Sequence, residues 1–254
     1  MTDRTLNRRF DRREVMGLIA LGASSAVAFA GTAGKLSARD VVVILVNARN
    51  GERPDLSHRD LSDLNLADLD FNGADLTGTN LFGADLTASN LESANLSRAI
   101  LDRATLVRAR FAHATLQDAS IRRPSVFSDM RFDARDLPVF QNANLTGVRF
   151  TARLDGADFR GADLSNASFA LWQERDLGGA PTSGLDRCDF TAARMCGVNM
   201  RGLSLRQSSF QNADLRDADL RNTDLTGANL KGAVLKGAKL DGANLKDVVG
   251  STPP

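Results

Sequence analysis

Two cysteines and two histidines are the side chains of this chain best suited to nucleophilic or metal chemistry. Cys188 and Cys196 lie close together in the sequence, whereas His58 and His113 are far from them and from each other. There is no Cys-x-x-Cys pair and no His/Cys cluster with the spacing of a zinc site. The patterns H-E-x-x-H and G-x-S-x-G and the phosphate-binding loop do not occur either. We therefore expect no catalytic residue, no metal and no cofactor.

Acidic and amide residues form a second candidate set, because their oxygen atoms can hold a cation. They recur just before a large apolar residue, as at Asp75, Asp85, Asn90 and Asn229. The calcium-binding repeat Gly-Gly-x-Gly-x-Asp is absent from the sequence. We expect these side chains to form solvated ladders on the outside of the fold. A cation held at a corner of the fold is the alternative.

The elements that position these residues follow from a period of five. An apolar residue, called the centre below, occupies every fifth position from Leu56 to Val126 and again from Leu185 to Leu245. The residue two places before the centre is usually small, and the residue just before it is usually polar. This alternation is typical of a short strand, and the two polar residues that follow can turn the chain. Such units wind into coils, which must stack because one unit cannot bury its own apolar side.

The register also predicts where the reactive side chains point. Cys188 takes the small position and should face the interior, whereas Cys196 follows the centre Met195 and should face outward. These opposite directions argue against a disulfide between the two cysteines. Both histidines are expected on the outside.

The repeated unit resembles a known motif. Ala74-Asp75-Leu76-Thr77-Gly78 is similar to the Ala-(Asp/Asn)-Leu-x-x motif of pentapeptide-repeat proteins, and the resemblance covers about residues 54–247. It implies an all-β fold, namely a right-handed quadrilateral (four-sided) β-helix solenoid of pentapeptide repeats with a short N-terminal capping segment. Four pentapeptides per coil and about nine coils are expected on this basis.

The chain then divides into six segments. They are a signal peptide (1–30), an N-terminal cap that we expect to be helical (31–53), a first repeat block (54–126), irregular repeats with bulges and a candidate loop at 172–182 (127–184), a second repeat block (185–247) and a tail (248–254).

The cap carries helix signals. Ser37 can act as the N-cap with Asp40 three residues later, and Gly51 can end the helix. Val41, Ile44, Leu45 and Ala48 would then share one face. The run from Val41 to Val46 is rich in β-branched residues, so a strand is the alternative. Either element would cover the open first coil.

Three changes of register interrupt the repeat. Successive centres are 14 residues apart from Val126 to Phe140, 4 from Phe150 to Leu154 and 16 from Phe169 to Leu185. We interpret shifts of one residue as bulges within a coil. The segment 172–182 contains Trp172 and a Gly-Gly-Ala-Pro cluster, so it could instead leave the coil as a partner-binding loop. A tolerated insertion with Trp172 packed on the fold is the alternative.

The N-terminus has the features of an export signal. Arg12 and Arg13 precede a mildly apolar segment and an Ala28-x-Ala30 cleavage site. The pair resembles a bacterial twin-arginine signal, although Asp11 before it and Val15-Met16 after it depart from the usual pattern. We expect a periplasmic or secreted protein with no stable membrane insertion after cleavage. A protein tethered to the membrane by an uncleaved signal and a cytoplasmic protein with an amphipathic or disordered tail are the alternatives.

Arginines concentrate between Ser97 and Ser125. Most of them lie two places after a centre, so they would encircle a four-sided rod rather than line one side, which is a poor arrangement for binding nucleic acid. An ordinary solvated mixture of charges is the alternative to a binding role. The candidate partner surface comprises Arg98, Arg103, Arg108, Arg110, Arg123 and Trp172.

These observations favour a non-enzymatic, exported interaction scaffold that binds an unidentified protein partner through its flat sides, a loop or an end. Nothing in the sequence covers the last coil, and the family resemblance implies an end-to-end homodimer there. A DNA mimic that engages topoisomerases, as in quinolone-resistance members of the family, is the alternative, and an enzyme is a third hypothesis. Mimicry requires strong negative potential, whereas removal of residues 1–30 would leave a net charge of −1.

Overall fold

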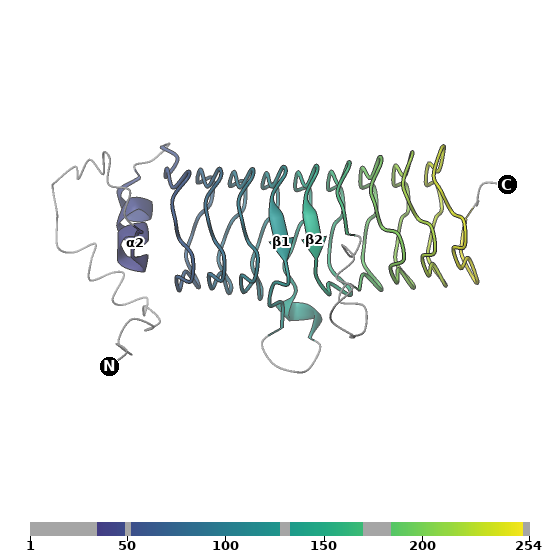
Figure 1. Cartoon of the computed structure of the whole chain (residues 1–254), viewed down its shortest axis with the longest axis horizontal. Helices are drawn as coiled ribbons and strands as arrows, with labels where there is room; N and C mark the ends of the chain where they lie inside the picture. Colours follow the sequence, from purple (N-terminus) through teal and green to yellow (C-terminus); the bar gives the residue numbers. More distant parts are fainter. Residues whose placement is uncertain (1–34, 49–51, 128–132, 170–183, 251–254) are drawn as a thin grey trace, which may run out of the picture.

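The computed structural model describes residues 35–48, 52–127, 133–169 and 184–250. In these ranges the chain forms a rod of stacked coils with one helix against the end where the stack begins (Figure 1). The named elements are short: α2 spans Ala38–Asn47, β1 Ser120–Arg122, η1 Ala134–Asp136 and β2 Arg149–Thr151. No helix in the described ranges is both long and apolar enough to span a lipid bilayer.

Backbone pairing between coils repeats every twenty residues in the regular blocks. Asp55 pairs in parallel with Asp75, and Asn80 pairs with Ile100. Because one such pair falls in each pentapeptide, a coil holds four pentapeptides and presents four walls. We number the walls 1 to 4 by the centres of the first coil, which are Leu56, Leu61, Leu66 and Phe71. Strands β1 and β2 belong to wall 2 and pair in parallel with Ser120 opposite Arg149.

Each corner is a tight turn that follows the centre. At the first centre, the N–H of Arg59 donates to the carbonyl of Leu56, and His58 between them has a φ of 56°. A positive φ at the third turn residue alone is the pattern of a type II turn. The carboxylate of Asp55 accepts the N–H of Ser57 at 2.9 Å, as in an Asx turn. Where an Asp or Asn precedes the centre, its side chain therefore stabilises the corner that follows. The predicted solvated ladders do not include this role.

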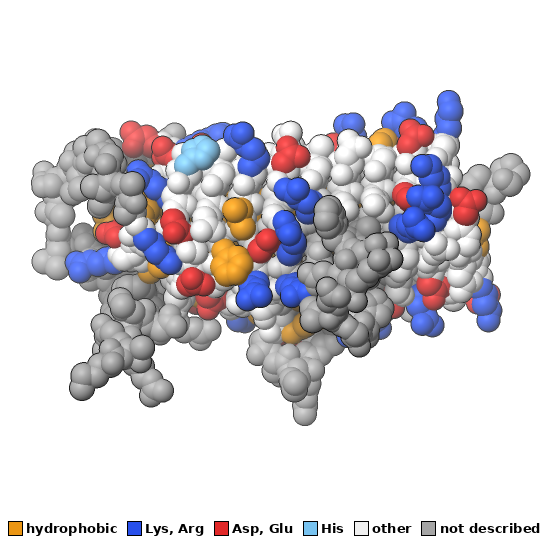
Figure 2. Space-filling view, viewed as in Figure 1, with side chains coloured by type: hydrophobic (Ala, Val, Ile, Leu, Met, Phe, Trp, Pro, Cys, Tyr) orange, Lys and Arg blue, Asp and Glu red, His pale blue; other side chains and the backbone are white. Residues whose placement is uncertain are grey.

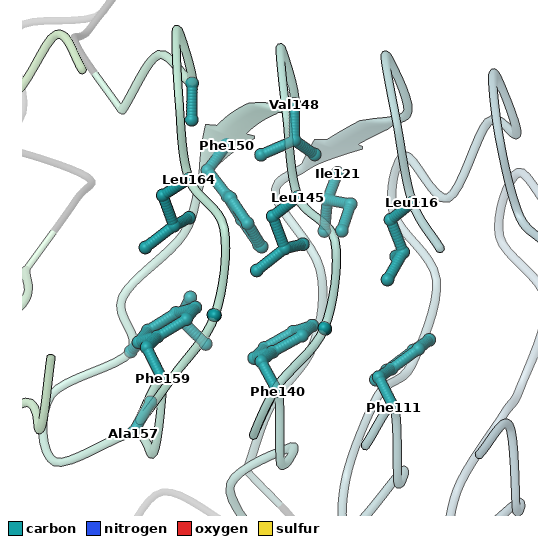
Figure 3. Packing of buried hydrophobic residues seen from close by; sticks show 14 of the residues in the cluster. Phe111, Leu116, Ile121, Phe140, Leu145, Val148, Phe150, Ala157, Phe159 and Leu164 are labelled. Atoms are coloured by element: carbon teal, nitrogen blue, oxygen red, sulfur yellow. The ribbon is translucent and has the colours of Figure 1, made fainter. Parts of the chain in front are cut away.

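The centres fill the interior of the rod. Five phenylalanines of wall 4 stack in one column with ring centroids 5.0 to 5.1 Å apart. Phe140 lies between Phe111 and Phe159 in this column, and aliphatic centres lie across the interior from it (Figure 3). The column consists of Phe111, Phe140, Phe159, Phe190 and Phe210. The small residues before the centres are buried too, which lets neighbouring parts of a coil approach closely.

The first interruption is larger than the spacing of centres indicates. Arg110 pairs with Val139, so the pairing offset rises to 29. That is nine residues more than a regular coil, and the extra segment carries η1 outside the stack (Figure 1). The bulge expected between Val126 and Phe140 is therefore wrong. A gap of 14 fits both three short units and one unit plus an insertion, and spacing alone cannot separate them.

The other two interruptions differ from each other. Asn144 pairs with Asp163 at an offset of 19, so the coil that includes Phe150 to Leu154 is one residue short, as expected. Arg153 pairs with Gly184 at an offset of 31, which is eleven residues more than a regular coil. The candidate loop 172–182 and Trp172 fall within this excess and lie outside the described residues.

Helix α2 covers the first coil. The Ser37 side chain accepts the N–H of Asp40, and the Asp40 carboxylate accepts the N–H of Ser37 at 2.9 Å. This capping box confirms the predicted helix start and decides against the strand. Val41 and Val42 are buried, and the latter was not in the predicted face.

The helix ends earlier than expected. Its last residue is Asn47 and its C-cap is Ala48, so Gly51, which lies outside the described residues, does not end it. Residues 1–30, with Arg12 and Arg13, also lie outside the described residues, and the export signal stays a prediction.

Candidate interaction surface

The two cysteines are free thiols in separate environments. Cys188 is buried, and its Sγ donates to the carbonyl of Leu154 at 3.1 Å. Burial raises the pKa of the Cys188 thiol far above its usual value. Arg216 donates to the Sγ of Cys196 at 3.7 Å, yet partial burial and a hydrogen bond with Asp214 raise the pKa of this thiol as well. Neither cysteine is activated as a nucleophile, since activation requires a lowered pKa.

The histidines lie on the surface at separate corners. His58 follows a centre of wall 1 and His113 follows a centre of wall 4, and both are exposed with positive φ. Over the ranges that the structure covers, no group of three or more His, Cys, Asp or Glu side chains is placed to hold a metal ion. These side chains therefore do not converge with the cysteines into a reactive site.

Many surface arginines are already neutralised by nearby aspartates. Nη2 of Arg216 lies 2.6 Å from Oδ2 of Asp214, and Nη2 of Arg221 lies 2.6 Å from Oδ2 of Asp219. The Arg221 guanidinium lowers the pKa of the Asp219 carboxyl to about 2. In each pair the aspartate lies just before a centre and the arginine just after it. The ion pair therefore spans the start of the turn and neutralises both charges there.

The arginines predicted to bind a partner are placed differently from those pairs. Arg98, Arg103 and Arg108 sit at successive corners with φ between 57° and 60°, so they encircle the rod. All three are exposed, and none forms an ion pair with an acidic residue in the described ranges. Arg123 shares this corner position with a φ of 51°. Arg110 instead lies just before a centre and pairs with Glu92 at 3.2 Å.

Two exposed apolar residues that sequence reasoning missed lie beside these arginines. The exposed fractions of Phe82 and Ile100 are 38% and 42%. Both belong to wall 2, because Ile100 pairs with Asn80 two residues before Phe82. The guanidinium carbon of Arg103 lies over the Phe82 ring, 5.7 Å from its centroid. Figure 2 shows exposed hydrophobic side chains amid charged ones on the visible face of the rod. The sequence signal was an apolar residue where neighbouring repeats have polar ones.

The repeats match a known family over most of the described rod. The sequence model for pentapeptide repeats matches eight copies, at residues 55–87, 89–123, 139–170, 185–222 and 213–249. These residues cover more than half of the chain. The chain belongs to the pentapeptide-repeat family. Pentapeptide-repeat proteins are typically non-enzymatic structural proteins.

Solved structures of other pentapeptide-repeat proteins resemble this one. HetL, involved in heterocyst differentiation regulation in the cyanobacterium Nostoc sp. strain PCC 7120, is 30% identical, with 77% of this chain and 76% of HetL covered and a TM-score of 0.32. Full-length QnrB1, a plasmid-mediated fluoroquinolone resistance protein, is 15% identical, with 74% of this chain and 90% of QnrB1 covered and a TM-score of 0.32. Rfr23 from the cyanobacterium Cyanothece 51142 is 17% identical, with 66% and 91% covered and a TM-score of 0.27. No protein with a curated description matches the chain.

Proposed function

We propose that this protein is a non-enzymatic scaffold that binds a protein partner through its walls, built as a right-handed quadrilateral β-helix like family members of known structure. One observation carries the proposal. The side chains that could do chemistry are buried, isolated or engaged with the backbone, while unpaired arginines and exposed apolar residues stand together on a regular rod. A rigid surface of this kind suits recognition because little conformational entropy is lost when it binds.

The proposal is tested by capturing partners on the purified protein and then measuring binding of each candidate as a pure component. Wild type is compared with an Arg103→Glu, Arg108→Glu variant and with Trp172→Ala, which covers the predicted loop. We expect a direct partner whose affinity falls in at least one variant. Failure of every captured protein to bind in pure form would remove the scaffold function.

We also propose that the protein is exported by the twin-arginine route to the periplasm or beyond. The support is the sequence around Arg12 and Arg13, and a folded rod is a suitable cargo for this route. Cell fractionation should find the wild type outside the cytoplasm and an Arg12→Lys, Arg13→Lys variant inside it. Retention of the wild type in the cytoplasm would contradict export, and persistent membrane association would favour the uncleaved anchor.

An end-to-end homodimer through the last coil is a further part of the proposal. In the described residues, the N–H groups of Leu235, Leu240 and Leu245 have no acceptor, and the side chains of the last two are only partly buried. A second copy could satisfy both the backbone and the apolar surface. Light scattering should give about twice the chain mass of 27.2 kDa for the full-length chain. A single-chain mass at micromolar concentration would reject the dimer.

The DNA-mimic alternative has less support. A mimic needs walls of continuous negative charge, whereas the aspartates of this rod alternate with arginines such as Arg216 and Arg221. A gyrase supercoiling assay separates the two hypotheses. We expect neither inhibition nor protection of gyrase, and either effect would revive the mimic.

A further inference from the structure

Ile100 is an exposed aliphatic residue at a position that holds Asp60 and Asn80 in the two preceding coils of its wall. One coil earlier, Asn80 Oδ1 accepts the N–H of Phe82 at 3.2 Å. Ile100 occupies the equivalent position but has no acceptor, and the N–H of Asp102 has no acceptor in the described residues. Ile100 is not packed in the core either, since 42% of its surface is exposed. A residue that gives up a local hydrogen bond without packing in the core is a candidate for function.

Phe82 is the second departure on the same wall. The equivalent positions in the adjacent coils hold Ser62 and Asp102, which are polar. Phe82 lies on the coil next to Ile100, so the two apolar side chains border one surface of wall 2. Arg103 lies against the Phe82 ring at 5.7 Å, a cation–π distance that holds both side chains in place.

Positive charge continues along this wall beyond the apolar residues. Ile100 pairs with Ser120, and Ser120 pairs with Arg149 on the following coil. Arg103 and Arg149 are exposed and have no acidic partner in the described residues. Arg122 is also exposed. Its Nε lies 3.5 Å from Oδ2 of Asp102, and its own backbone N–H donates to the same carboxylate. Three arginines therefore face solvent along wall 2 from the apolar pair onward, and Asp102 pairs with one of them, Arg122.

We propose that wall 2, from Phe82 to Arg149, binds an acidic segment of a partner protein. An apolar side chain of this segment packs on Phe82 and Ile100, and its carboxylates face Arg103, Arg122 and Arg149. The apolar contact supplies a buried anchor, and the charges set the register and speed the encounter. The inference rests on the proposed scaffold function and specifies the surface and the chemistry of the partner. We name this region the wall 2 surface.

The test selects peptides from a phage-displayed library of random dodecapeptides on the full chain. Selected peptides are synthesised, labelled and titrated against four proteins by fluorescence anisotropy at low and high salt. The proteins are the wild type, Phe82→Ser with Ile100→Asn, Arg103→Glu with Arg149→Glu, and Lys231→Glu with Lys236→Glu as the control on other walls. The first double variant introduces the residue types of the neighbouring coils, Ser62 and Asn80, so it should fold, which circular dichroism and thermal unfolding verify.

We expect selected peptides to be rich in Asp and Glu around at least one large apolar residue. Their affinity should fall about tenfold or more in each wall 2 variant, change less than about twofold in the control variant, and weaken at high salt. Peptides that bind the wall 2 variants as tightly as the wild type would leave the scaffold function standing and overturn this surface. Selection of basic or uncharged peptides, or of none, would overturn the stated chemistry.

Two further outcomes identify a different occupant and also overturn the inference. One is a homodimer, seen by light scattering, that the Phe82→Ser, Ile100→Asn variant dissociates. The other is binding of a single-stranded oligonucleotide that the same variant abolishes, since exposed aromatic and arginine side chains can also hold bases.

Discussion

The carboxylate of Asp102 accepts the backbone N–H of Arg122 at 3.0 Å, although the two residues are twenty apart in the chain. In most corners this N–H is bound by an Asp or Asn two residues before it, but here that position is Ser120, which donates to the same carboxylate. The same arrangement recurs at Arg206, where Ser204 precedes the centre. The carboxylate of Asp186, on the preceding coil, accepts the N–H of Arg206 at 2.9 Å. An acid in one coil thus completes the turn of the next coil and couples the two.

This coupling leads to a first prediction. Asp102→Ala should lower the free energy of unfolding by about 1 to 2 kcal/mol, because it leaves the Arg122 N–H without its charged acceptor. Adding Ser120→Asn should restore part of the loss by supplying a local acceptor. Denaturant unfolding measures both effects. Asp241→Ala is the control, since Asp241 has the equivalent position on wall 2 and its carboxylate accepts no backbone N–H in the described residues. Equal losses at the two sites would contradict the coupling.

A second prediction concerns two glycines with the same backbone conformation. Gly73 and Gly83 have φ of 69° and 67°, but only at Gly83 would an added Cβ collide with the Oδ1 of Asp63 on the preceding coil. Both Ala variants carry the strain of a left-handed residue, about 1 to 2 kcal/mol. Gly83→Ala should therefore be the less stable variant in thermal unfolding. The difference should vanish in an Asp63→Ala background, and its persistence there would show that the collision is not its cause.

A third prediction tests the phenylalanine column. Phe140 has ring neighbours on both sides with centroids 5.1 Å away, and its side chain is fully buried. Phe140→Ala should lower the free energy of unfolding by about 3 to 5 kcal/mol, because lost apolar burial and a cavity add together. Phe82→Ala, on the surface, should change it by less than about 1 kcal/mol. Similar losses for both would mean that the column does not form the core.

A fourth prediction concerns acid stability. The folded pKa of Asp219 is lowered to about 2 by Arg221, below the unfolded value of about 3.9. The stabilisation is therefore present above the unfolded pKa and is lost as the pH falls through the folded pKa. Arg221→Gln should lower the melting temperature at neutral pH, and its difference from the wild type should shrink as the pH falls from about 4 to 2.

The control for this prediction is Arg201→Gln. Arg201 occupies the same position one coil earlier, where its neighbour is Asn199, which does not titrate. Its effect should not depend on pH over this window. An NMR titration of the Asp219 carboxyl that gives an unshifted pKa would contradict the proposed pairing.

The turns after the centres could be predicted from the sequence, because they involve residues close together in the chain. The centre at Leu56 and the turn at His58 follow from the five-residue pattern, because inward apolar residues and a tight turn involve only chain neighbours. The role of Asp55 as an acceptor for Ser57 was accessible by the same logic, since Asx turns are local. The predicted solvated ladders do not include this role, because they place the Asp55 carboxylate in solvent and leave out its hydrogen bond to the backbone of its own corner.

The candidate interaction surface could be predicted from the sequence only in part. The girdle of arginines and the shared wall of Phe82 and Ile100 follow from the period and four repeats per coil, because both lie in the regular block. The assignment of Arg149 to this wall does not follow, because it depends on how many residues the coil between Ser120 and Arg149 contains. The gap between Val126 and Phe140 lies in that coil, and spacing alone does not show whether it holds short units or an insertion.

The sequence by itself determined the period, the identity of the buried centres and the capping box at Ser37, because each of these depends on residues within a few positions of one another. Only the tertiary structure decided which corners adjoin, and hence that Asp102 serves Arg122 and that Arg103 lies over Phe82. Those contacts join residues 20 and 21 apart in the chain, and the offset between paired coils ranges from 19 to 31 because of insertions and deletions elsewhere in the stack. Stacking of coils, rather than the local pattern, sets these offsets.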